Sequence, residues 1–159
     1  MSFKKFALVA SVFALAACGG KSESAPAEET AAAPAVETAP AAAPAPVTGT
    51  THEIKMIGDE KGYRFEPANL TVKTGDAVKY VFVSGGPHNV AFEGATLSAD
   101  VKKQLDANFS AKMAELSSNM MLNAGETVTI SFAGIPAGKY PFNCTPHLAM
   151  NMKGVITVE

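Results

Sequence analysis

The stretch Tyr140-Pro-Phe-Asn-Cys-Thr-Pro-His-Leu-Ala-Met-Asn-Met-Lys-Gly154 carries three metal-binding side chains on one short loop. They are Cys144, His147 and Met152, and strand-like sequence lies on either side of them. A cysteine thiolate, a neutral imidazole and a thioether in combination suit copper, which accepts soft sulfur and borderline nitrogen together. We therefore expect a copper site where this loop leaves a β-sandwich.

A fourth ligand is available in Gly86-Pro-His-Asn-Val90, where His88 begins another strand-like run. Two histidines, one cysteine and a weak axial methionine form the ligand set of blue-copper electron-transfer sites. Met150 and Met152 both follow His147 with the same parity, so alternation alone does not choose the axial ligand.

The phase of the alternating residues brings these ligands to one end of the expected core. Side chains at positions i and i+2 of a strand face the same side of the sheet. Three sets share a parity with apolar neighbours: His88, Val90 and Phe92; Tyr140, Phe142 and Cys144; and Met152, Gly154, Ile156 and Val158. If the apolar members face inward, the ligands do as well.

Residues 52–159 resemble the plastocyanin/azurin family of small blue-copper proteins. The motifs that carry the resemblance are Pro87-His-Asn-Val90, Cys144-Thr-Pro-His147 and Met152-Lys-Gly154. The spacing Cys-x-x-His-x-x-x-x-Met-x-Gly is that of plastocyanins, and Cys-Thr-Pro-His also resembles amicyanins. The resemblance implies a Greek-key sandwich and one type 1 copper ion bound by His88, Cys144, His147 and Met152.

The resemblance also implies roles for neighbouring residues. Met152 matches the Met-x-Gly that ends the family's loop and is favoured over Met150 as the axial ligand. Asn89 is expected to tie the His88 strand to the ligand loop, and His147 to lie at a small apolar rim as the exit for the electron. Asn143 replaces the tyrosine that plastocyanins associate with a remote docking patch, so the resemblance does not extend to an electron route through that patch. The expected partners are redox proteins such as c-type cytochromes or membrane oxidoreductases.

Short alternating segments separated by turn residues predict an all-β, antiparallel sandwich over residues 51–159. The inward-facing sets include Ile54 and Met56, then Val78, Tyr80 and Phe82, and later Val128, Ile130 and Phe132. One inserted helix is expected. Ser98 is its N-cap, and apolar residues recur every four positions at Val101, Leu105, Phe109 and Met113.

The first fifty residues have a different character. Met1–Ala17 resembles a secretory signal with Lys4 and Lys5 before an apolar run, which is too short to span a bilayer. Leu15-Ala-Ala-Cys18 resembles a bacterial lipobox, so we expect Cys18 to be lipidated and the protein to be anchored in the bacterial cell envelope, periplasmic or extracytoplasmic. A plain cleavable signal is the alternative. Residues 18–50 are rich in alanine, proline and glutamate and predict a disordered linker, either a swinging tether or an inert spacer.

The composition of the chain and its potential ligands argue against several other classes of protein. The chain of 159 residues is 47% hydrophobic, which suits one modest domain, and its net charge of −2 indicates no nucleic-acid partner. No oxyanion site or orienting third group accompanies Cys144 and His88, so a cysteine hydrolase is not expected. Zinc accepts cysteine and histidine, but a thioether is a poor zinc ligand. A copper chaperone or storage protein is the alternative to the electron carrier.

Overall fold

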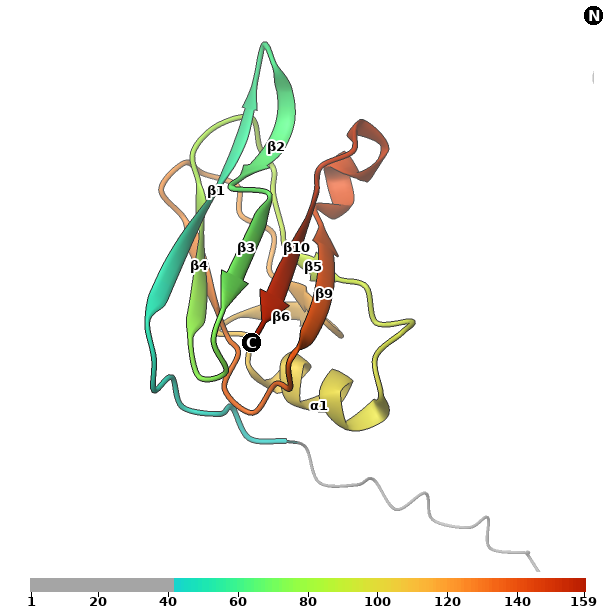
Figure 1. Cartoon of the computed structure of the whole chain (residues 1–159). Helices are drawn as coiled ribbons and strands as arrows, with labels where there is room; N and C mark the ends of the chain where they lie inside the picture. Colours follow the sequence, from blue (N-terminus) through green and yellow to red (C-terminus); the bar gives the residue numbers. More distant parts are fainter. Residues whose placement is uncertain (1–41) are drawn as a thin grey trace, which may run out of the picture. The chain divides into compact units, whose positions relative to one another are not determined.

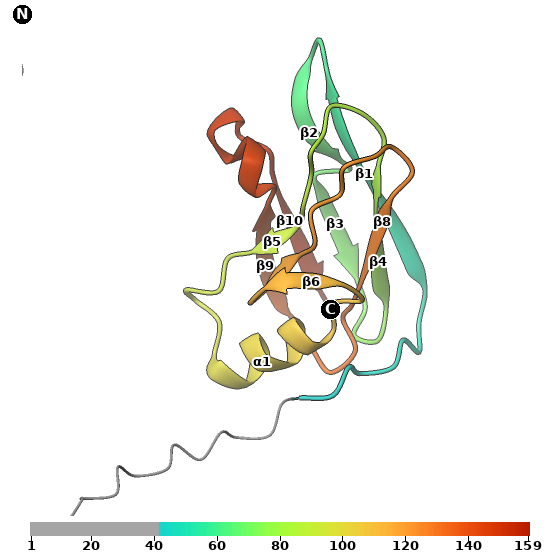
Figure 2. The same cartoon turned by 180° about the vertical axis from the view of Figure 1, so that it is seen from behind.

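The computed structural model describes residues 42–159, which fold into two facing β-sheets with one short helix at the end remote from the ligand loop (Figures 1 and 2). The strands are β1 (Thr51–Asp59), β2 (Gly62–Glu66), β3 (Asn69–Val72), β4 (Ala77–Phe82), β5 (Ala91–Phe92), β6 (Lys112–Ala114), β7 (Ser117–Ser118), β8 (Thr127–Ser131), β9 (Gly138–Asn143) and β10 (Lys153–Val158). The helices are α1 (Ala99–Ala107) and the 3-10 helix η1 (Thr145–Met150).

One sheet has the order β2-β1-β4-β8 and the other the order β3-β10-β9-β5-β7-β6. The predicted all-β sandwich with a short inserted helix is confirmed. Its sheets are mixed, however, and not purely antiparallel, because β1 pairs with β4 and β3 pairs with β10 in parallel. Alternation along a strand reports which face is buried, and it carries no information on the direction of the neighbouring strand.

The core lies between the sheets and is built from the inward-facing sets predicted by parity. From one sheet Ile54, Tyr80 and Ile130 are fully buried, and from the other Phe142 and Ile156 are fully buried. Burial of such side chains contributes on the order of 2 kcal/mol each, before the loss of chain entropy is counted. This apolar core is the scaffold that holds the ligand loops at its end.

The helix begins as predicted and ends earlier than predicted. Ser98 is the N-cap and its hydroxyl accepts from the Val101 amide at 3.4 Å. Beyond Ala107 the chain leaves the helix, because the Asn108 side chain donates to the carbonyls of Ser131 and Ala133. Met113 therefore lies on β6 with 62% of its surface exposed. Its four-residue spacing from Phe109 is a coincidence of sequence.

The segment before β1 is hydrogen-bonded to the domain. The amide of Ala45 donates to Asn108 Oδ1 at 2.9 Å, and the amides of Thr48 and Gly49 donate to the carbonyl of Gly75. The first strand begins at Thr51, as the predicted boundary implies, but ordered structure extends back into the predicted linker. Within residues 42–159, neither helix is long and apolar enough to cross a membrane.

Asp76, in the turn before β4, anchors this segment. Its carboxylate accepts from the amides of Lys73 and Thr50 and lies 2.8 Å from Nε2 of His52. The side chain of His52 is thereby half-buried and paired. The Lys73 amide, then His52 and the Thr50 amide, lower the pKa of Asp76 from 3.8 to about 2.

A pH dependence of stability follows from this contact. The folded-state pKa of Asp76 lies below the unfolded value, so the ionised carboxylate stabilises the fold above about pH 4, and this stabilisation is lost as the pH falls toward 2. We expect Asp76→Asn to lower the free energy of unfolding most above pH 4, with the difference from wild type shrinking toward pH 2. Urea denaturation across this pH range measures the difference. A difference that stays constant with pH would contradict the assignment.

Candidate metal centre

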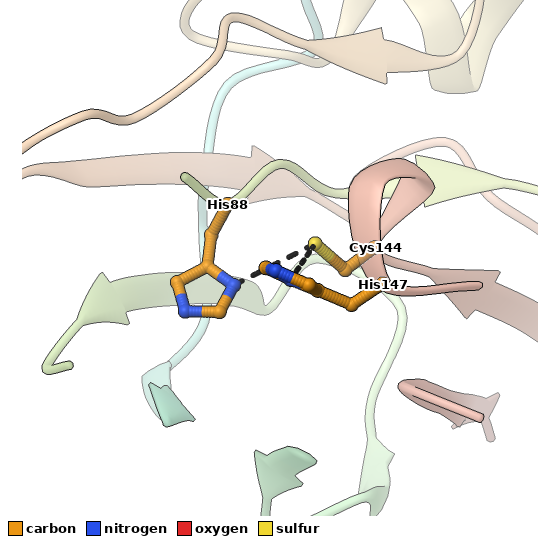
Figure 3. Close-up of side chains that lie close together, drawn as sticks. All are labelled: His88, Cys144 and His147. Atoms are coloured by element: carbon orange, nitrogen blue, oxygen red, sulfur yellow. Dashed lines mark hydrogen bonds between the residues drawn. The ribbon is translucent and has the colours of Figure 1, made fainter. Parts of the chain in front are cut away.

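Three side chains from separate segments meet at one end of the sandwich (Figure 3). His88 lies in the loop after β4, Cys144 directly follows β9, and His147 lies in η1. The Sγ atom of Cys144 is 3.6 Å from Nδ1 of His88 and 3.4 Å from Nδ1 of His147. One donor atom from each residue lies within 4.8 Å of the others, and all three residues are buried. Two imidazole nitrogens and a sulfur thus converge on one small volume.

His88 is held by its backbone and by its ring. Its amide and carbonyl exchange hydrogen bonds with those of Met121, at 3.0 and 2.8 Å. Its Nε2 lies 2.9 Å from the carbonyl of Ser84, which accepts a hydrogen bond from the ring and leaves the Nδ1 lone pair free for a metal. The Phe82 ring packs edge-on at 4.9 Å. Burial lowers the pKa of His88, and the Ser84 carbonyl only partly opposes this, so the imidazole is neutral near pH 7.

Cys144 is fully buried. Burial raises the pKa of its thiol, and the amides of Asn89 and His147 offset part of this effect. The metal-free protein therefore holds a neutral thiol. Because a metal binds the thiolate, metal uptake at this site must release the thiol proton.

His147 is largely covered by its neighbours. Only 5% of its surface is accessible, because the ring of Tyr63 stacks on it with centroids 3.7 Å apart and an angle of 17°. Burial, and then the neighbouring His88, lower the pKa of His147. The expected role of His147 as the exit for the electron stays a prediction. The exposed apolar side chains next to it are Leu148 and Met150, at 43% and 55%.

The two candidate axial methionines have different environments. Met152 is fully buried, and its carbonyl accepts from the Cys144 amide at 3.1 Å while its amide donates to the His147 carbonyl at 3.2 Å. Met150 ends η1 and points largely into solvent. The left-handed conformation of Asn151, with φ of 61°, separates the two residues and breaks the alternation that they share in sequence.

Asn89 joins three segments beneath the site. Its Oδ1 accepts from the Thr145 amide at 2.8 Å, and its Nδ2 donates to the hydroxyls of Thr145 and Ser117, each at 3.1 Å. The side chain is 2% exposed. The His88 segment, the ligand loop and β7 are therefore fastened to one another.

The sequence motifs do not include Tyr63 or the Ser84 carbonyl, although both contact the histidines. A signal for Tyr63 exists in Gly62-Tyr-Arg-Phe-Glu66, where Tyr63 shares the parity of the buried Phe65. No side-chain pattern can indicate a backbone carbonyl. Cys18, the predicted lipidation site, lies outside the described residues.

The donor set fits copper. Two imidazoles and one thiol that ionises on metal binding converge here, and the buried Met152 is hydrogen-bonded through its backbone to Cys144 and His147. Together these residues offer the soft and borderline ligands that copper accepts. A β-sandwich that gathers these groups at one end defines the class of small blue-copper proteins, the cupredoxins.

Comparisons with known proteins identify the family. The family model "Copper binding proteins, plastocyanin/azurin family" matches residues 52–159, and the chain belongs to this family. It is 35% identical to a plastocyanin of Nostoc punctiforme over 113 residues, which cover 69% of this chain and 74% of that one. It is also 35% identical to a plastocyanin of Dryopteris crassirhizoma over 105 residues, 65% of this chain and 96% of that one. The oxidised form of the latter superposes with a TM-score of 0.53 at 30% identity, covering 67% of this chain and 99% of that one. The cofactor is one type 1 copper ion.

Proposed function

We propose that this protein is a single-electron carrier of the bacterial cell envelope, tethered to a membrane by lipid on Cys18 and not an enzyme. Copper would be held by His88, Cys144, His147 and Met152 and would supply the Cu(II)/Cu(I) couple. The observation that carries the proposal is the convergence of both Nδ1 atoms on the Cys144 sulfur. The family to which the chain belongs supports the same chemistry.

A carrier needs ligands that move little when the metal changes its oxidation state. The ring of His88 is fixed by the Ser84 carbonyl, and the ligand loop is fastened through Asn89. Buried partners of this kind orient the ligands and tune the metal. A chaperone or storage protein would instead hold Cu(I) through sulfur and would not need this rigid pair of histidines. A visible absorption spectrum of the oxidised, copper-loaded protein separates the two: intense blue or green colour supports the carrier, and its absence supports storage.

The end of the sandwich around the site suits transient docking. The loops at residues 83–90, 119–125 and 145–152 hold no aspartate, glutamate, lysine or arginine. They expose Val83, Leu122, Leu148 and Met150. A small, uncharged apolar face favours contacts that form and release quickly, as expected with redox partners such as c-type cytochromes or membrane oxidoreductases.

The axial ligand is tested by a pair of matched substitutions. We expect Met152→Leu to keep the blue colour and raise the reduction potential, because a weak donor to Cu(II) is lost. Met150→Leu is the control, since the exposed Met150 thioether should leave the potential unchanged. Spectroelectrochemical titration measures both. A shift in Met150→Leu without one in Met152→Leu would show that Met150 is the axial ligand.

The anchor is tested at Cys18. We expect Cys18→Ser to prevent maturation as a lipoprotein, so that the chain no longer fractionates as a triacylated membrane protein, while its visible spectrum is unchanged. Mass spectrometry of the mature N-terminus checks the modification directly. The orientation of the domain agrees with a tether, because residues 42–50 join the sandwich at the end away from η1 (Figure 1). An unmodified terminus at another residue would refute the anchor.

A further inference from the structure

The two histidines of the site are oriented by different means. The ring of His88 is fixed through Nε2 by the carbonyl of Ser84. Nε2 of His147, in contrast, has no hydrogen-bond partner within residues 42–159, and it is not among the fully enclosed polar atoms of this part of the chain. It therefore keeps contact with solvent, although the residue as a whole is 5% exposed.

The torsions of a histidine do not by themselves fix its ring. The χ2 rotation is broad and roughly two-fold, so either Nδ1 or Cδ2 can face a given direction. A ligand histidine normally donates its second ring N–H to a fixed acceptor, which selects one orientation. His147 lacks this contact within residues 42–159, so its orientation toward Cys144 needs another cause.

Tyr63 provides a contact of the right geometry. Its ring lies nearly parallel to the His147 imidazole, with centroids 3.7 Å apart and an angle of 17°. It also meets His88 edge-on, at 6.2 Å and 66°. Tyr63 thus covers the outer side of the site and contacts both imidazoles, and only His147 is stacked face to face.

The β1–β2 hairpin positions Tyr63 for this role. Tyr63 is paired with Gly58 across the two strands. A Cβ atom added to Gly58 would lie 2.7 Å from Cε1 of Tyr63 and 2.8 Å from the Cα atom of Gly85, so the missing side chain leaves room for the ring. Tyr63 shares the inward parity of Phe65, which is buried in the core. Tyr63 lies two residues before Phe65 on the same face, near the start of β2, and there it reaches the metal site.

We propose that Tyr63 is a positioning residue that holds the His147 imidazole with Nδ1 toward Cys144, by stacking, before the metal binds. The inference rests on the proposed function only in taking His147 as a ligand. It assigns to the Tyr63 ring the orienting task that the Ser84 carbonyl performs for His88.

The test uses three variants of the full chain. Tyr63→Leu removes the ring, Tyr63→Phe keeps it, and Glu66→Leu changes the solvent face of the same strand as a matched control. In metal-free protein, NMR should show the His147 ring protons shifted upfield by the Tyr63 ring in wild type, Tyr63→Phe and Glu66→Leu. In Tyr63→Leu these signals should move downfield and broaden. Cu(I) removal by a competing chelator should be about tenfold faster in Tyr63→Leu alone.

Several results would overturn the proposal. They are unchanged His147 signals in Tyr63→Leu, equal copper release in all four proteins, or a Tyr63→Phe variant that behaves like Tyr63→Leu. Wild-type protein decides the matter even if Tyr63→Leu does not fold, because the stacked rings must give nuclear Overhauser contacts with each other, and their absence refutes the stack. The metal-free NMR result does not depend on electron transfer, so failure of the carrier function would be seen separately, as missing blue colour.

Discussion

Cys144→Ala is expected to abolish the intense visible absorption of the oxidised, copper-loaded protein completely. The colour of a type 1 site requires a thiolate bound to Cu(II), and Cys144 is the one cysteine within residues 42–159. Its sulfur lies within 3.6 Å of both histidine Nδ1 atoms, at the position where the metal would bind. The measurement is an absorption spectrum after loading with Cu(II).

The other cysteine of the chain provides the matched control. Cys18→Ser replaces a cysteine far away in the sequence and should leave the colour intact. Circular dichroism of Cys144→Ala checks that the sandwich persists, which we expect because the apolar core lies between the sheets and does not depend on the thiol. Retained colour in Cys144→Ala would overturn the assignment of the site.

Asn89→Ala is expected to lower the free energy of unfolding by about 3 kcal/mol. The substitution removes three hydrogen bonds of a buried side chain, each contributing about 1 kcal/mol, and it leaves the Thr145 amide without its acceptor. It also unfastens the ligand loop from the His88 segment. We therefore expect faster loss of copper together with the loss of stability. Urea denaturation of the metal-free protein measures the stability on its own.

Asn69→Ala is the control for this change. Asn69 is an exposed residue at the start of β3, paired with Val155 of β10, and its replacement should alter the free energy of unfolding by no more than about 0.5 kcal/mol. Equal effects of the two substitutions would mean that the hydrogen bonds of Asn89 do not fasten the ligand loop to the His88 segment.

Local patterns in the sequence predicted which residues form the core of the sandwich and which residues form the candidate metal site. The alternation of Val78, Tyr80 and Phe82 gives the buried face of β4, because successive side chains of a strand point to opposite sides. The same alternation predicted that the side chains of His88 and Cys144 point inward. Ser98 marked the start of α1, since an N-cap acts over three residues. Each of these signals depends on neighbours within a few positions of the chain.

Only the tertiary structure decided the features that join distant segments. The helix ends at Ala107 because Asn108 binds the carbonyls of Ser131 and Ala133, and the segment before β1 is ordered by the same side chain and by Asp76. The parallel pairing of β1 with β4 has no signature in either strand.

The tertiary structure also decided which side chains surround the metal site. Met150 and Met152 have the same parity in sequence, and a left-handed residue between them sends one to solvent and the other into the core. Tyr63 reaches His147 because the β1–β2 hairpin lies beside η1 at the end of the sandwich (Figure 1). The sequence determined which groups can bind the metal, since donor chemistry belongs to each residue alone. The fold decided what covers and orients them, because packing depends on segments that meet only when the sheets close on each other.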